Sequence, residues 1–279
     1  MAALSYCATQ VRDFDNDRFL ATLFADEAVR EDLFALYAFN LELSKIRETV
    51  SEPMIGRMRL QFWRDAMPGI AVGNPPKHAV AAPLAVLAER GRLPAQAMTT
   101  LIDAREIDLD EIPPADLSAI EDYAAQTSST LMAAALHILG HDPAEHDALL
   151  RSAGIATALV GLVRAIPFMA SSGRVTLPAD LCRKAGLDPA MPHQWPQNPD
   201  VSAITMPLLR AAADHLKAAR TKSGTLPRSA LPALLPMSLA AVYLRGLEKS
   251  GGDPARYQAR PPGVQRHLTV LWRSVLGRP

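Results

Sequence analysis

The stretch 26-DEAVREDLFALYAFNLELSKIRETV-50 decides the fold class of this 279-residue chain. Apolar residues and a few polar ones recur in it at spacings of three and four, which is the spacing that lines one side of a helix. The residues on that side are Leu33, Leu36, Tyr37, Asn40, Leu41, Ser44 and Glu48. A helix over 26–50 is therefore the first element that the sequence predicts.

The same spacing continues along nearly the whole chain. It predicts further helices near 54–67, 84–90, 94–109, 116–139, 145–170, 202–221, 229–249 and 262–276. Alternating strand patterns are absent from the sequence apart from a short arm at 174–177. The proline-rich stretches, 187–200 above all, show no change in composition on either flank, so we interpret them as loops. The sequence predicts one all-α domain over 1–279, with 250–279 as its C-terminal segment.

Composition limits the classes of partner and compartment. Lysine plus arginine and aspartate plus glutamate both number 29, so no net field draws in nucleic acid, and we expect no nucleic-acid partner. Cys7 and Cys182 stand far apart without a CxxC motif, which fits a reducing compartment. The N-terminal stretch reaches Arg12 without an apolar core, and the apolar stretch 231–244 is too short for a bilayer. We expect a cytoplasmic protein, either soluble or peripherally attached to a membrane.

Two clusters of polar residues suggest metal sites, and each has a simpler interpretation. His137, His141 and His146 lie close in sequence, but Gly140 and Pro143 break the helix between them, so ordinary solvated histidines are the better interpretation. The acidic run 103-DAREIDLDE-111 has the oxygen ligands that Mg²⁺ prefers. Its apolar residues fit a solvated helix end equally well.

A basic helix at 54–67 suggests a surface function. Arg57, Arg59 and Arg64 alternate there with apolar residues. Such a helix suits a membrane interface with anionic lipid or a partner surface. The alternative is a buried helix whose arginines extend their charged ends to the solvent.

Several segments, taken in order, resemble the squalene/phytoene synthase family over roughly residues 5–245. They are SYCATQVRDFDNDRFLATLFADEAVREDLFALYAFNLEL (5–43), RLQFWRDAM (59–67), DAREIDL (103–109), YAAQTSSTLMAAALHILG (123–140) and GLVRAIPFMASSGRVTLPADL (161–181). The resemblance implies the isoprenoid-synthase fold, a helical bundle around a central cavity. It also implies enzymes that join two prenyl diphosphates head to head after Mg²⁺-assisted ionisation.

That chemistry depends on two aspartate-rich motifs, and the resemblance places both in this chain. The first follows YAFN (37–40), and its aspartate positions fall on Ser44, Lys45 and Glu48. The second precedes GRVTLP (173–178), and its aspartates fall on Ala165 and Met169. Among these positions only Glu48 is acidic, so we expect no catalytic residue, no bound metal and no cofactor. The vestigial pocket implied by the resemblance comprises Tyr37, Asn40, Ser44, Lys45, Glu48, Gly161, Arg164, Ala165, Met169 and Arg174.

A narrower resemblance connects the chain with a branch of this family that lacks the aspartate motifs. The segments AFNLEL, VSEPMIGRMRLQFWRDAM, YAAQTSSTL, LVRAIPF and VTLPADLC are similar to the branch with a mitochondrial assembly factor for respiratory complex I. This implies a non-catalytic role in complex I assembly. The implied partner is a complex I subunit or an assembly intermediate at the cytoplasmic side of the inner membrane.

Two other functions remain open at the level of sequence. One is an active prenyl transferase with an altered Mg²⁺ site, built from Glu48 with Asp103 or Asp108. The other is a module that binds a prenyl lipid in the cavity without turnover. For all three functions we expect helices 26–50 and 145–170 to face each other across the cavity. The side chains expected to point inward are Ser44, Glu48, Arg164, Ala165 and Met169.

Overall fold

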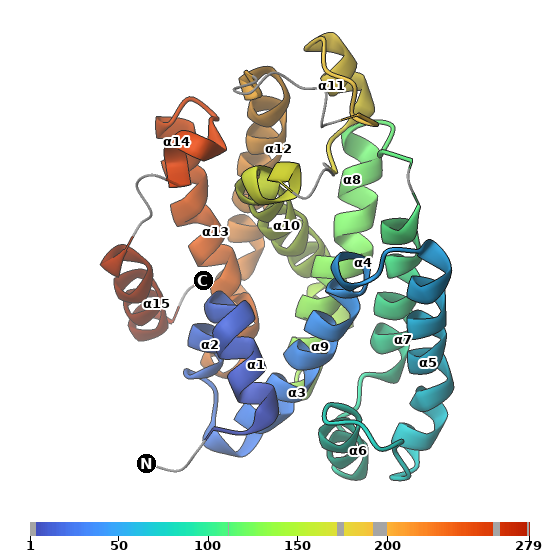
Figure 1. Ribbon diagram of the computed structural model, residues 1–279. Coiled ribbons are helices and arrows are strands. Elements are labelled where there is room, and N and C mark those ends of the chain that lie inside the picture. The colour runs from blue at the N-terminus through green and yellow to red at the C-terminus, as the bar shows by residue number, and fades with distance from the viewer. Residues whose placement is uncertain (1–3, 111, 172–175, 192–199, 259–262, 278) are drawn as a thin grey trace.

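The computed structural model describes residues 4–110, 112–171, 176–191, 200–258, 263–277 and 279, and its regular elements in these ranges are all helices. They form a single bundle (Figure 1). The α-helices are α1 (Tyr6–Phe14), α2 (Asn16–Thr22), α3 (Glu27–Ser44), α4 (Ile46–Thr49), α5 (Pro53–Ala71), α6 (Ala81–Glu89), α7 (Ala95–Ala104), α8 (Leu117–Ala124), α9 (Thr130–Ile138), α10 (Asp147–Ser171), α11 (Ala179–Lys184), α12 (Ser202–Lys222), α13 (Leu231–Lys249), α14 (Pro254–Gln258) and α15 (Val264–Leu276). Shorter pieces include the 3-10 helix η1 (Arg105–Leu109) and the π-helical η2 (Ala125–Ser129). The predicted all-α class is confirmed.

The centre of the bundle is built on α10 and α13. α13 is apolar on all sides, and nearly all of its residues are buried. α10 packs against α8, α9, α12, α13 and α14. By length and composition, Pro143–Ala170 and Arg228–Lys249 are each long and apolar enough to cross a membrane. The helix that contains 231–244 is thus longer than this apolar stretch, which by itself is too short for a bilayer. Since 89% of an apolar 18-residue segment of the second span is buried in the bundle, its apolarity is explained by the core.

Several predicted helices end or break at places that the spacing did not indicate. The predicted helix 26–50 stops at Ser44, and after Lys45 a separate short helix, α4, begins. α5 continues through Pro68 to Ala71, so it ends later than the predicted helix 54–67. The predicted helix 116–139 contains the π-helical η2. There Ser129 lies so close to α10 that a Cβ on Gly154 would come within 2.3 Å of its Cα.

The N-terminal residues form two helices that the spacing analysis did not predict. Ser5 and Asp15 begin α1 and α2 as N-caps, because their side chains accept hydrogen bonds from backbone N–H groups in the first turn. α1 packs along α3, and α2 packs against α13 (Figure 1). This arrangement places the N-terminal helices beside both motif regions. Arg174 and most of the proline-rich loop, 192–199, lie outside the described residues.

Candidate functional site

The first motif region carries a cation held on an aromatic ring. Lys45 follows the last residue of α3, and its Nζ lies 2.9 Å from the centroid of the Phe14 ring on α1. Burial lowers the pKa of Lys45, while Glu42 and Glu48 oppose that shift. Ser44 is half-buried, and its hydroxyl donates to the carbonyl of Leu41 at 3.1 Å. This region therefore presents a positive charge where the family places carboxylates.

Glu48, the acidic residue at the motif positions, is exposed on α4. Its position results from the helix break at Lys45. An unbroken helix would place Glu48 on the same side as Ser44, one turn further on. Because α3 ends and α4 starts anew, that relation does not hold. Since Glu48 is exposed, the expectation that it points inward is not borne out.

Tyr37 and Asn40, the residues of the YAFN segment, are buried and engaged with neighbouring side chains. The guanidinium of Arg18 lies 5.7 Å from the centroid of the Tyr37 ring, and burial raises the pKa of Tyr37. Asn40 accepts a hydrogen bond from Arg105 at 3.4 Å. Both side chains connect elements of the bundle.

The second motif region lies on α10, where Gly161, Arg164, Ala165 and Met169 are half-buried. Met169 packs against the core, and a Cβ added at Gly161 would meet no atom within 4 Å, so there is open space beside that glycine. Ala165 and Met169 are each partly covered, so their assignment to the second motif stays a prediction. Neither supplies an oxygen ligand.

Arg164 belongs to a polar cluster that sequence reasoning missed, here called the Asp17 cluster: Asp17, Arg164, Tyr243 and Arg266. The Arg164 guanidinium stands 3.7 Å from the centroid of the Tyr243 ring and 3.7 Å from Asp17 Oδ2. The Tyr243 hydroxyl donates to Asp17 Oδ1 at 2.6 Å, and Arg266 Nη1 lies 3.4 Å from the same oxygen. Burial, and then the charge of Asp17, raises the pKa of Tyr243. The cluster joins α2, α10, α13 and α15.

Lys45 and Arg164, the cations of the motif regions within the described residues, thus contact the N-terminal helices. Lys45 rests on Phe14 of α1, and Arg164 reaches Asp17 of α2. The carboxylate beside the second motif comes from α2, and two arginines and a hydroxyl already share its charge. In the described part of the chain, no three His, Cys, Asp or Glu side chains come together as a metal site. The donors at the motif positions do not fit Mg²⁺, which takes oxygen ligands.

A second cluster that sequence reasoning missed lies between η1 and α8. In this Arg105 cluster, Arg105 Nη1 donates to Asp108 Oδ2 at 3.1 Å and to the Tyr123 hydroxyl at 2.6 Å. The Tyr123 hydroxyl donates in turn to Asp108 Oδ1 at 2.6 Å. Burial raises the pKa of Tyr123. Burial alone would lower the pKa of Arg105, but Tyr123 and Asp108 outweigh it and raise the pKa overall.

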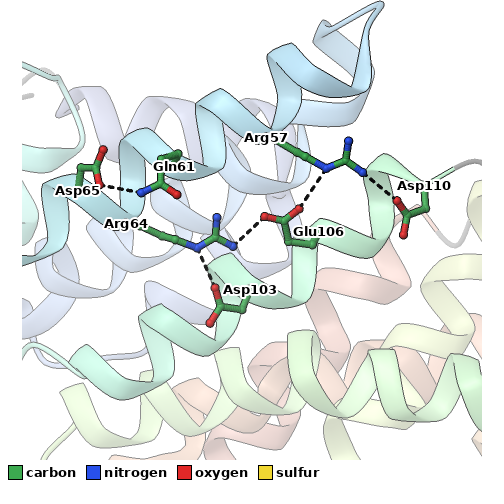
Figure 2. A network of polar contacts seen from close by, with 7 residues as sticks. All are labelled: Arg57, Gln61, Arg64, Asp65, Asp103, Glu106 and Asp110. Atoms are coloured by element: carbon green, nitrogen blue, oxygen red, sulfur yellow. Dashed lines mark hydrogen bonds and ion pairs between the residues drawn. The ribbon is translucent and has the colours of Figure 1, made fainter.

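The basic helix α5 forms an ion-pair network with the acidic run, as Figure 2 shows. Arg64 bonds to Asp103 and Glu106, both at 2.9 Å. Arg57 lies 3.1 Å from Asp110 and 3.7 Å from Glu106. Arg59 donates instead to the Thr49 hydroxyl at 2.7 Å. The charges of α5 are therefore largely matched within the protein, and its exposed face carries an apolar stripe of Met54, Ile55, Met58 and Phe62.

This network bears on the altered Mg²⁺ site considered from the sequence. Asp103 pairs with Arg64, and Asp108 pairs with Arg105 and Tyr123. Neither aspartate is paired with Glu48. The acidic run, over its described residues 103–110, thus divides its carboxylates between two sets of contacts within the protein.

Two surface hollows lie away from the motif positions. One, of about 650 Å³, is lined by residues of 112–115, 179–183 and 186–190. The other, of about 330 Å³, lies among α7, α8, η2, α9 and α10. None of the vestigial-pocket residues that the structure describes lines either hollow.

Comparison with known proteins identifies the family and the fold to which these motif positions belong. The family model for squalene/phytoene synthase matches residues 11–269. The chain belongs to the squalene/phytoene synthase family. The structure of a dehydrosqualene synthase in complex with ligand has the same fold, with a TM-score of 0.76 at 16% identity over 97% of this chain and 94% of that one. The isoprenoid-synthase-type bundle expected from the resemblance is confirmed.

Relatives within the squalene/phytoene synthase family divide into two kinds. A Bos taurus protein named NADH dehydrogenase (ubiquinone) complex I, assembly factor 6, is 33% identical over 266 residues, covering 95% of this chain and 78% of its own length. A presqualene diphosphate synthase from Rhodopseudomonas palustris is 27% identical over 209 residues, covering 73% of each chain. The similarity to the assembly factor is thus both higher and more extensive.

Proposed function

We propose that this protein is a non-catalytic member of the squalene/phytoene synthase family that acts in the assembly of respiratory complex I. The observation that carries the proposal is the 33% identity, over 95% of this chain, to a protein named as a complex I assembly factor. The geometry of the motif regions supports it, because among the described residues no set of carboxylates converges there.

The proposal that catalysis is lost rests on the charge balance of the family reaction. A diphosphate leaving group is highly anionic, and Mg²⁺ held by protein carboxylates neutralises it. Here the first region offers Lys45 on the Phe14 ring, and the second offers Ala165 and Met169. We therefore propose that the protein uses no metal and no cofactor. Its fold serves as a scaffold.

The partner in this proposal is a complex I subunit or assembly intermediate. The protein would meet it in the cytoplasm at the inner membrane, in peripheral contact with that membrane. The apolar stripe of α5 is a candidate partner surface, since it is exposed on a helix fixed by ion pairs. A prenyl lipid in the bundle is a second candidate ligand, favoured by the open space beside Gly161, and it is compatible with the assembly role.

A deletion strain of the source organism tests the assembly role. We expect deletion to lower assembled complex I on native gels and to lower NADH-dependent respiration, while carotenoid and hopanoid pools stay unchanged. The wild-type gene and the Glu48→Gln variant should both restore assembly, because Glu48 is exposed and has no catalytic task in this proposal. Normal complex I together with altered isoprenoids in the deletion strain would contradict the proposal.

An activity assay tests the loss of catalysis. Purified protein incubated with farnesyl or geranylgeranyl diphosphate and Mg²⁺ should release no diphosphate and form no product. Measurable turnover that disappears in Glu48→Gln would identify the protein as a transferase with an altered metal site. Lipid extracted from the purified protein and analysed by mass spectrometry tests for a bound prenyl chain.

A further inference from the structure

The last helix, α15, turns its apolar side to the solvent. Its apolar residues other than Val270 are 47–70% exposed: Val264, Leu268, Leu271, Trp272, Val275 and Leu276. Their spacings of three and four place them on one side of the helix. Val270, on the other side, is 1% exposed and packs into the core. α15 lies at the edge of the bundle, against α13 and α2 (Figure 1).

Polar contacts hold α15 in this orientation. Arg266 joins the Asp17 cluster through Asp17 Oδ1 at 3.4 Å. Arg228 donates to the backbone carbonyl of Val275 at 3.4 Å. Rolling the helix to bury its apolar side would break these contacts and expose Val270. The outward apolar side is therefore a fixed feature of the fold, and a contiguous apolar surface of this kind indicates an interaction site.

The surroundings of this surface are basic. After Asp253 the chain has five arginines, Arg256, Arg260, Arg266, Arg273 and Arg278, and no aspartate or glutamate. The charges of both Arg273 of α15 and Arg245 act on Arg220. Burial first, and then these two charges, lowers the pKa of Arg220. No carboxylate of the described residues forms an ion pair with Arg220, Arg245 or Arg273, in contrast to Arg57 and Arg64 of α5.

We propose that α15 docks this protein on an anionic phospholipid membrane, with its apolar side in the interface and Arg220, Arg245 and Arg273 at the headgroups. Amphipathic helices with aromatic and basic residues bind membranes in this way. At 1.5 Å per residue, its 13 residues span about 20 Å, less than the roughly 30 Å hydrocarbon core, so α15 lies on the surface. A second copy is a poorer occupant, because symmetric pairing would bring two like-charged arginine clusters together.

The inference assigns a helix to the membrane contact included in the proposed function. Its test uses purified protein and vesicles, so it can fail while the role in complex I assembly stands. Equally, it can succeed when deletion leaves complex I unchanged.

The experiment is co-sedimentation of the full-length protein with vesicles of phosphatidylcholine, with and without phosphatidylglycerol. We expect binding to the anionic vesicles and little binding to the neutral ones. The double substitution Leu268→Glu/Trp272→Glu should weaken binding by about tenfold or more, because it places charge in the apolar side. Arg220→Gln/Arg245→Gln should weaken binding to anionic vesicles by roughly fivefold per arginine. All four positions are exposed, so folding should persist and is checked by circular dichroism.

The matched control is Met54→Glu/Met58→Glu, which places the same charges on the apolar stripe of α5, where exposure is 62% and 66%. It should bind vesicles like the wild type. The inference would be overturned if the wild-type protein did not bind anionic vesicles. It would also be overturned if the α5 variant lost vesicle binding while the α15 variant kept it. A dimer in sedimentation velocity that the α15 variant dissociates, without vesicle binding by the wild type, would assign the surface to a second copy.

Discussion

The two sides of η1 carry arginine–carboxylate contacts of the same chemistry in different surroundings. On the inner side, the Arg105 and Asp108 side chains are 14% and 22% exposed and share their contacts with Tyr123. On the outer side, Arg64 and Glu106 are 27% and 39% exposed and pair with each other (Figure 2). The comparison teaches that burial sets what such contacts contribute. When one partner of the inner pair is removed, the remaining charged group stays partly buried and water cannot solvate it fully. A group left unpaired on the outer side is exposed, so water solvates it.

The largest expected effect is on the inner side. Arg105→Met should lower the free energy of unfolding by about 2–4 kcal/mol, because it leaves Asp108 and Tyr123 partly desolvated without their donor. Urea unfolding followed by circular dichroism measures it. The matched control is Arg64→Met, the same change on the outer side. Equal losses in the two variants would show that the difference in burial has no energetic consequence.

Tyr123→Phe should have an intermediate effect. Removing the hydroxyl breaks the hydrogen bond to Asp108 and the one from Arg105, and should cost about 1–2 kcal/mol in the same unfolding experiment. Tyr6→Phe, at a tyrosine that is 50% exposed, is the control and should cost less. A neutral Tyr123→Phe would mean that Asp108 and Arg105 satisfy each other without the phenol.

The buried Tyr123 on the inner side should also make the stability of the protein depend on pH. Burial raises the pKa of Tyr123 above its usual value near 10, so the folded state holds a proton that the unfolded state releases. The contribution is complete below pH 10 and is lost as the pH rises toward the folded-state pKa. The wild type should therefore lose stability more steeply than Tyr123→Phe above about pH 10. Unfolding at a series of alkaline pH values measures this, and identical slopes would contradict it.

The smallest effect is expected on the outer side. Arg64→Met should cost less than about 1 kcal/mol, because its carboxylate partners are exposed and water replaces the lost contacts. The loss should shrink further at high salt, which screens exposed charges, while the loss in Arg105→Met should change little. A large, salt-independent loss in Arg64→Met would place the network of Figure 2 among the buried interactions.

Several features of the fold and site could be predicted from the sequence because they are local. The spacing of apolar residues predicted most helices. The family motifs placed Lys45, Ala165 and Met169 at ligand positions, and a lysine, an alanine and a methionine lack carboxylate oxygens in any structure. The break at Lys45 was not predicted, because a single residue that interrupts a helix leaves the spacing of the apolar residues before and after it unchanged.

Contacts between segments far apart in the chain could not be predicted from the sequence. Asp17 and Tyr243 stand 226 residues apart, and nothing in their local patterns marks them as partners. Likewise, 103–111 appeared in the sequence as a single acidic run, although packing divides the described residues 103–110 into an inner and an outer set of contacts.

The sequence by itself determined that the chain is all-α, which family frame it has, and that its motif positions lack all but one carboxylate. It also determined that α15 has an apolar and a polar side, because both follow from residue type and spacing. Only the tertiary structure decided which side faces inward. In α15 the side with Arg266 and Val270 packs against the bundle, and the side with Leu268 and Trp272 is exposed. The physical reason is that burial is a relation between segments far apart in the chain. A helix carries its own periodicity, but its neighbours in the fold decide which side is covered.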